Sequence, residues 1–182
     1  MICASGIDIA TPVLWVALVM GLLIGSFLTV VIDRVPRGAS VVQPGSACGS
    51  CGLELGPLDL VPVMSWLALR GKCRKCRQPI GIEPIIVEIV TATLFVLMAI
   101  HFERSVLVAA FCVFAAGLTG LTVIDLKTQR LPREVSYTVM ALGAPLLVIA
   151  ALIDNEPRRI YMALIGATIS LAVMGVLYIA SR

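Results

Sequence analysis

Charged residues are scarce in this sequence. Only 14% of its 182 residues are Asp, Glu, Lys or Arg, whereas 59% are hydrophobic and the mean hydropathy is +1.03. A soluble hydrophobic core does not require so much apolar material. The net charge of +3 is also too small to call for a nucleic-acid partner. The composition therefore excludes an ordinary soluble domain and predicts a polytopic membrane protein.

The chain also lacks internal repeats and low-complexity tracts, and no basic segment precedes its first apolar run, which argues against a cleaved signal peptide. Five apolar runs cover residues 11–32, 84–102, 105–124, 135–153 and 160–180. Each is close to the roughly 20 residues that a helix needs to cross the hydrocarbon. Because lipid forces the backbone to satisfy its own hydrogen bonds, we predict an all-α bundle of about five transmembrane helices.

Basic residues set the expected orientation, since Lys and Arg are retained in cytoplasmic loops. Eleven of the 14 fall on one side: Arg34, Arg37, Arg70, Lys72, Arg74, Lys75, Arg77, Lys127, Arg130, Arg133 and Arg182. The other side has Arg104, Arg158 and Arg159. We therefore expect the N-terminus outside and the cysteine-containing loop in the cytoplasm. The expected parts are a first segment and helix (1–33), a cytoplasmic loop (34–83) and a bundle (84–182).

The cytoplasmic loop contains two Cys-x-x-Cys pairs separated by 21 residues, at Cys48, Cys51, Cys73 and Cys76. This spacing is typical of a tetrahedral zinc site. Two disulfides would need an oxidising compartment, so metal binding is favoured over both disulfides and unmetallated thiols. Cys3 and Cys112 are isolated and are interpreted as ordinary apolar residues. The basic residues around the second pair favour contact with anionic lipid head groups rather than DNA.

Three acidic residues lie at the ends of the predicted helices. Asp33 closes the first helix beside Arg34 and is interpreted as part of an interfacial ion pair. Glu88 lies about 6 Å into the second helix, where it complements the macrodipole or faces the bundle interior in a functional role. Asp125 closes the third helix before the turn at Pro132, and a lone acidic residue at such an edge is usually a solvated helix end.

Three stretches together resemble one family. They are Gly25-Ser-Phe-Leu-Thr-Val-Val-Ile-Asp-Arg-Val-Pro36, Pro62-Val-Met-Ser-Trp-Leu-Ala-Leu-Arg-Gly-Lys-Cys-Arg74 and Ile124-Asp-Leu-Lys-Thr-Gln-Arg-Leu-Pro132. The chain resembles the type IV prepilin peptidases, membrane aspartic proteases that remove the leader of type IV prepilins or type II secretion pseudopilins. The resemblance implies that the new N-terminus is then methylated with S-adenosylmethionine, and that the chain lies in a bacterial inner membrane. If Glu88 has the functional role open to an intramembrane carboxylate, we expect it to contact substrate or methyl donor.

The resemblance also implies a catalytic pair of aspartates, the first matched by Asp125 and the second in a Gly-x-Gly-Asp motif. One carboxylate activates water while the other polarises the carbonyl. No Gly-x-Gly-Asp occurs in residues 1–182, so we expect a chain shortened before the motif or a divergent member without peptidase activity. Thr29 replaces a common Asn, and Ile82-Glu-Pro84 replaces Arg-Tyr-Pro. No Gly-rich nucleotide-binding signature is present.

Two functions of different class follow. The first is a prepilin peptidase with Asp125 in its catalytic pair and a zinc loop that helps to bind the leader or supports methyl transfer. The second is a non-catalytic membrane scaffold that docks a pilus or secretion partner through the zinc loop. The second aspartate discriminates between them.

Overall fold

Long helices dominate the computed structural model, which describes residues 7–102, 105–129, 131–155 and 157–180. In chain order the α-helices are α1 (Ile7–Arg34), α2 (Met64–Ala68), α3 (Glu83–His101), α4 (Ser105–Thr128), α5 (Arg133–Ile153) and α6 (Pro157–Ala180). Two short 3-10 helices, η1 (Val35–Arg37) and η2 (Pro57–Leu60), lie between α1 and α2. Five of the α-helices are long and apolar enough to cross a membrane, as the five apolar runs predict.

Among the described residues, the closest approach of one helix backbone to another joins α1 to α3. A Cβ atom built on Gly21 would lie 2.5 Å from the Cα of Ala92, and one built on Gly25 would lie 2.7 Å from the Cα of Glu88. The two glycines are four residues apart and so share one face of α1. This Gly-x-x-x-Gly pattern lets two backbones approach closely in lipid, where small residues drive helix packing. The spacing is visible in the sequence, although its role was not predicted.

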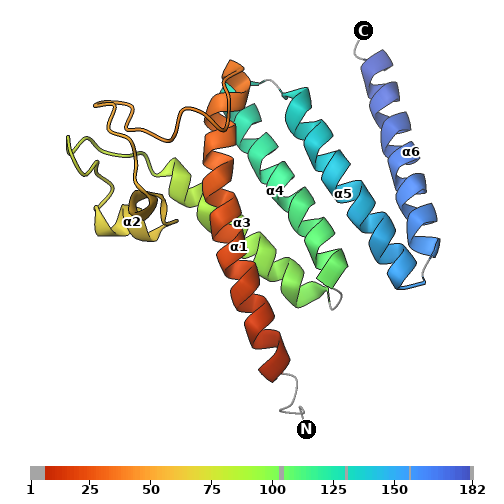
Figure 1. Ribbon diagram of the computed structural model, residues 1–182. Coiled ribbons are helices and arrows are strands. Elements are labelled where there is room, and N and C mark those ends of the chain that lie inside the picture. The colour runs from red at the N-terminus through yellow and green to blue at the C-terminus, as the bar shows by residue number, and fades with distance from the viewer. Residues whose placement is uncertain (1–6, 103–104, 130, 156, 181–182) are drawn as a thin grey trace.

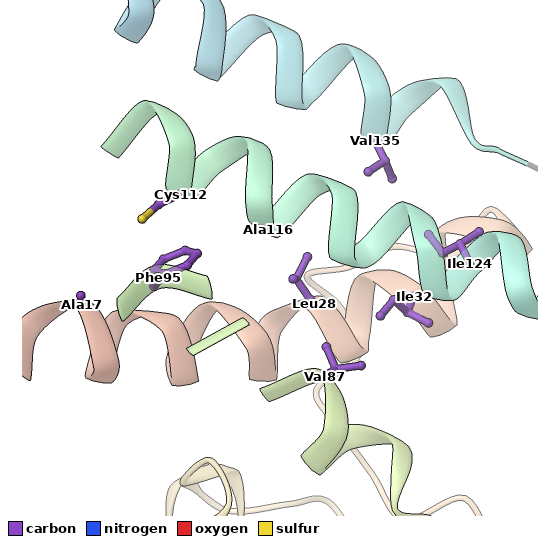
Figure 2. Close-up of a cluster of buried hydrophobic side chains, with 9 residues drawn as sticks. All are labelled: Ala17, Leu28, Ile32, Val87, Phe95, Cys112, Ala116, Ile124 and Val135. Carbon is purple, nitrogen blue, oxygen red and sulfur yellow. The ribbon is translucent and has the colours of Figure 1, made fainter. Parts of the chain in front are cut away.

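A hydrophobic core extends from this contact into α4 and α5 (Figure 2). Its buried members are Ala17, Leu28 and Ile32 of α1, Val87 and Phe95 of α3, Cys112, Ala116 and Ile124 of α4, and Val135 of α5. Gly117 of α4 lies against Val139, while Gly143 of α5 lies against Phe114, so small and large residues interlock across the α4–α5 contact. The core therefore joins four of the long helices.

The sixth helix differs from the others. α6 contacts α5, and its side chains are exposed from Tyr161 to Ala180. In Figure 1 it stands apart from the other long helices, away from α1. Exposed apolar residues on a membrane-spanning helix face lipid rather than water.

The segment between α1 and α3 forms a small unit beside the bundle, on the side of α1 away from α5 and α6 (Figure 1). Arg34 joins its start to α1, because its guanidinium donates to the carbonyl oxygens of Ser40, Pro44 and Gly45 at 3.0, 2.7 and 3.2 Å. Asp33 forms an ion pair at the end of α1, as expected, and its partner is Arg37 at 2.7 Å rather than the adjacent Arg34. Residues four apart share a helix face, whereas adjacent residues do not.

Candidate functional site

The four paired cysteines meet in one cluster within the loop after α1. Cys48 Sγ lies 3.8 Å from Cys76 Sγ, and Cys51 Sγ lies 3.9 Å from Cys73 Sγ. All four sulfur atoms lie within 4.8 Å of one another, and these cysteines are free thiols. A zinc ion with four sulfur ligands at about 2.3 Å requires sulfur atoms about 3.8 Å apart. The cluster therefore has the size and the donor chemistry to hold a metal ion.

The two Cys-x-x-Cys arms have the same backbone structure. An isolated antiparallel bridge brackets each arm, Ala47 with Glu54 in the first and Lys72 with Pro79 in the second. In the first arm the N–H of Cys48 donates to Leu53 at 2.8 Å and the N–H of Gly52 donates back to Cys48 at 2.9 Å.

In the second arm Cys73 donates to Gln78 at 2.9 Å, and Arg77 donates to Cys73 at 3.1 Å. Both of these bonds of the first arm thus recur 25 residues later. The fourth residue after the leading cysteine has a positive φ in both arms, 67° at Gly52 and 59° at Arg77. Each arm is therefore a tight turn that presents two sulfur atoms to the same point.

Backbone N–H groups favour the thiolate of each leading cysteine. The N–H groups of Ser50 and then Cys51 lower the pKa of Cys48 to about 6. Those of Cys76 and then Lys75 lower the pKa of Cys73.

At Cys76 the N–H of Gln78 lowers the pKa, but burial and the neighbouring cysteines outweigh it and raise the pKa to about 11. Thiolate is the form that binds metal. One thiol of each arm is thus prepared as a ligand.

A cavity of about 440 Å³ lies between the cysteine cluster and the ends of α1 and α3. Ser26 and Thr29 of α1 line it, together with both leading cysteines and Glu88 of α3. Its size is within the usual range for small-molecule sites. The cavity therefore connects the cysteine cluster with the membrane helices.

Glu88 is buried, with 6% of its surface exposed, and it holds the loop against the bundle. Its Oε2 accepts the N–H of Val63 at 2.7 Å. Val63 has φ 58° and ψ −47°, and the N–H of Met64 donates to the carbonyl of Pro62 at 2.5 Å across it. This geometry is a classic γ-turn, a strained conformation for a β-branched residue.

The strain at Val63 costs about 1–3 kcal/mol, and a hydrogen bond to a charged group contributes about 1.5–3 kcal/mol. The Glu88 carboxylate therefore offsets the strain of the turn that it holds. The contact of Glu88 with the loop is a structural one, and its expected role toward substrate or methyl donor stays a prediction. The γ-turn itself had no sequence signal, because valine is disfavoured at positive φ.

Trp66 supplies an unused donor at this cavity. Its Nε1 is buried and has no hydrogen-bond partner among the described residues. The indole ring packs on Gly71, where a Cβ would lie 2.7 Å from Cζ2 and φ is 67°. A buried N–H without a partner is uncommon and is satisfied when a ligand or water accepts from it. Trp66 and Glu88 thus offer a ligand one donor and one anion.

Asp125 lies apart from this cavity, in the last turn of α4. Its side chain is exposed, while the preceding Ile124 is fully buried in the core. Two residues further, Lys127 pairs with Glu83 at the start of α3, at 2.5 Å. This ion pair places Asp125 at the end of the bundle from which the cysteine loop extends. Asp125 does not line the cavity that contains Glu88.

An apolar groove of about 510 Å³ lies between α3 and α4. Ile86, Val90 and Leu94 line one wall, and Phe111, Leu118 and Val123 lie on the other. Val123 is two residues before Asp125, so the groove runs along the membrane-spanning part of the bundle toward the aspartate.

Comparison with known proteins places these features in a family. The model of the bacterial peptidase A24 N-terminal domain matches residues 19–102, which contain the Gly-x-x-x-Gly pattern, the cysteine cluster and Glu88. A prepilin leader peptidase/N-methyltransferase of Myxococcus xanthus is 39% identical over 128 residues, covering 70% of this chain and 38% of the relative. This chain belongs to the prepilin leader peptidase family.

Other family members agree with this assignment. A prepilin leader peptidase/N-methyltransferase of Neisseria gonorrhoeae is 33% identical over 151 residues, covering 70% of this chain and 53% of the relative. A type 4 prepilin-like proteins leader peptide-processing enzyme of Escherichia coli is 33% identical over 178 residues, covering 88% of this chain and 64% of the relative. The chain spans about half the length of the curated relatives it matches. No solved structure matches it.

Family membership and the five long apolar helices make the chain a multi-pass membrane protein. The expected fold class, an α-helical membrane bundle with a four-cysteine unit after its first helix, is confirmed.

Proposed function

We propose that this chain carries one half of the aspartic dyad of a prepilin peptidase, and that the half is Asp125. The observation that carries the proposal is the position of Asp125. Its carboxylate is solvent-exposed on a helix turn fixed by buried Ile124 and by the Lys127–Glu83 ion pair, at the end of a membrane-embedded apolar groove. A prepilin or pseudopilin whose apolar segment lies in that groove presents its leader peptide bond to Asp125.

The second carboxylate comes from a Gly-x-Gly-Asp motif, as the family resemblance implies. Two neighbouring carboxylates share a proton, so one accepts a proton from water while the other donates to the scissile carbonyl. Asp125 supplies one of these groups. The scaffold alternative has no observation that favours it.

We propose in addition that the cavity beside Glu88 binds the methyl donor or the new N-terminus during N-methylation. Both ligands carry a positive charge that suits the buried Glu88 carboxylate, and Trp66 Nε1 is a donor without a partner among the described residues. These two groups and the cavity volume fit S-adenosylmethionine, which supplies the methyl group when bound. Glu88 orients the positively charged centre, and the surrounding apolar side chains exclude water.

Zinc is the metal we propose for the cysteine cluster, because four thiolates in a tetrahedron are its preferred structural site. The cysteine loop and Asp125 are proposed to lie on the cytoplasmic side of a bacterial inner membrane, with the N-terminus outside. The excess of Lys and Arg in the loops on that side supports this orientation.

The test uses a chimera in which this chain is followed by the corresponding C-terminal part of the Myxococcus relative, which supplies the second aspartate. Membranes with the chimera are incubated with a prepilin and S-adenosylmethionine, and mass spectrometry follows leader removal and N-methylation. Asp125→Asn should reduce cleavage by a factor of about 10⁴, as loss of an essential acid–base group does. Asp33→Asn is the matched control, since Asp33 is another exposed aspartate near a helix end, paired with Arg37. Cleavage that survives Asp125→Asn excludes the dyad assignment.

The same assay separates the role of Glu88. Glu88→Gln keeps the size of the side chain and an oxygen that accepts from Val63, but removes the charge. We expect methylation to fall by at least about tenfold while cleavage persists, because only methylation uses the carboxylate as a counter-ion. Equal loss of both activities would instead indicate a structural role in holding the loop.

A further inference from the structure

A segment of the cysteine loop lies beside the membrane-spanning helices α1 and α3 rather than beyond their ends. This interfacial segment, residues 57–69, contains η2 and α2. The N–H of Val63 bonds to Glu88, five residues after the first residue of α3. Five helical residues correspond to about 7.5 Å, so the middle of the segment lies well below the end of α3.

The position of the Gly25–Glu88 contact along α1 leads to the same conclusion about the level of the segment. Gly25 contacts the backbone of Glu88, and α1 continues for nine residues beyond Gly25, to Arg34, a distance of about 13 Å. Ile32, in this continuation, is still buried in the hydrophobic core. The interfacial segment thus lies beside α1 well before its C-terminal end, and Figure 1 shows α2 at the level of the central part of α1.

The two sides of α2 have different surroundings. Trp66 and Leu69, three residues apart, line the cavity beside Glu88. Met64 and Leu67, also three residues apart, are 64% and 57% exposed. Leu58 in η2 is 75% exposed. Large apolar side chains on the outside of an extramembrane unit are unfavourable in water but are typical of elements that insert into the lipid head-group region.

Basic residues come directly after this apolar segment in the sequence. Between residues 70 and 77 the chain has Arg70, Lys72, Lys75 and Arg77, and it has Arg74, whose guanidinium bonds to Asp59 at 3.0 and 2.7 Å. The first arm has the same backbone structure and contains no Lys or Arg between residues 46 and 54. The metal cluster therefore does not require these cations, and their function lies outside it.

We propose that the interfacial segment inserts its apolar side into the lipid head-group region, and that Arg70, Lys72, Lys75 and Arg77 bind the phosphates of anionic lipids above it. Apolar insertion beside a basic cluster is the usual structure of interfacial anchors, in which each basic residue adds attraction to an anionic leaflet. The bilayer that surrounds α1 and α3 is continuous with this surface. The short helix α2 also supplies Trp66 to the cavity beside Glu88. Contact of α2 with lipid would therefore hold this outer wall of the cavity in place.

The test uses tryptophan fluorescence of the full chain in vesicles. Trp15 and Trp66 are the only tryptophans, so Trp15→Phe leaves Trp66 as a reporter within α2. The vesicles contain phosphatidylcholine brominated either near the head group or near the chain ends. We expect head-group bromine to quench Trp66 more strongly than chain-end bromine. An absence of quenching by bromine at both depths would overturn the insertion.

The basic residues are tested in the same variant. Adding phosphatidylglycerol to the vesicles should increase quenching by head-group bromine, and Lys72→Gln/Lys75→Gln/Arg77→Gln should abolish that increase. Arg158→Gln removes an exposed cation in the first turn of α6 and should leave the increase intact. If phosphatidylglycerol has no effect, or if the triple variant retains it, the basic cluster does not bind lipid and belongs to a protein interface.

Discussion

Arg77 and Gly52 occupy equivalent positions in the two cysteine arms, but only glycine suits the backbone there. Both have positive φ, which costs an L-amino acid with a side chain about 1–2 kcal/mol and costs glycine almost nothing. The second arm therefore folds with local strain that the first arm avoids.

Arg77→Gly should relieve this strain and strengthen metal binding. We expect the free energy of zinc binding to become more favourable by about 1 kcal/mol. This corresponds to about a fivefold increase in the chelator concentration that removes half of the zinc. The measurement is chelator competition on protein purified in uncharged detergent. Lys75→Gly is the matched control, because it removes an equal charge at a residue without positive φ. If Lys75→Gly strengthened zinc binding as much as Arg77→Gly, the effect would come from the loss of charge rather than from relief of backbone strain.

Cys73→Ser should remove the metal. A serine hydroxyl is a poor zinc ligand, and three remaining thiols leave the site open, so the zinc content should fall from about one ion per chain to near zero. Protease cleavage within the loop should increase, because loops of this size depend on their metal. Metal analysis and limited proteolysis measure the two effects, with Cys112→Ser in α4 as the control. Full zinc content in Cys73→Ser would exclude the four-cysteine site.

Sequence spacing predicted the residues of the cluster but not their surroundings. The four cysteines meet as expected because two Cys-x-x-Cys pairs have few other uses. The partner of Glu88 lies 25 residues earlier in a strained turn, and no local pattern indicates such a contact. The position of Asp33 at the helix end predicts an interfacial ion pair, and helix geometry selects Arg37, four positions later, as the partner.

Among the elements, the long helices were the most predictable. The five apolar runs agree with α1, α3, α4, α5 and α6 to within a few residues, because lipid selects for length and composition together. The short helix α2 was not predicted. It has only five residues and depends on the γ-turn and on its packing beside the cavity, which are tertiary features.

The contact between α1 and α3 should be the element pair most sensitive to added volume. Gly21→Ala places a methyl group 2.5 Å from a backbone atom of Ala92, which no rotamer change can relieve, and should destabilise the bundle by about 1–3 kcal/mol. Unfolding in mixtures of mild detergent and dodecyl sulfate measures the change. Gly166→Ala in α6 meets no atom within 4 Å and should be nearly neutral. Equal effects of the two substitutions would contradict the close helix contact.

For the whole molecule, the orientation in the membrane is a prediction from the basic loops. An alkaline phosphatase domain, active only outside the cytoplasm, can be inserted after Asn155 or after Leu131. The basic loops predict activity after Asn155 and inactivity after Leu131. The opposite result would invert the topology and would place the cysteine loop and Asp125 outside the cytoplasm.

The α1–α3 contact would also govern how the cysteine loop encounters the proposed zinc ion. The arms lie 21 residues apart on a loop whose two ends are held by helices in direct contact, so the arms cannot diffuse away from one another. Such tethering turns capture by the second arm into an intramolecular step at high effective concentration. A zinc ion released by one arm would therefore be recaptured by the other before it escapes, and metal exchange would be confined to the loop while the bundle keeps its shape.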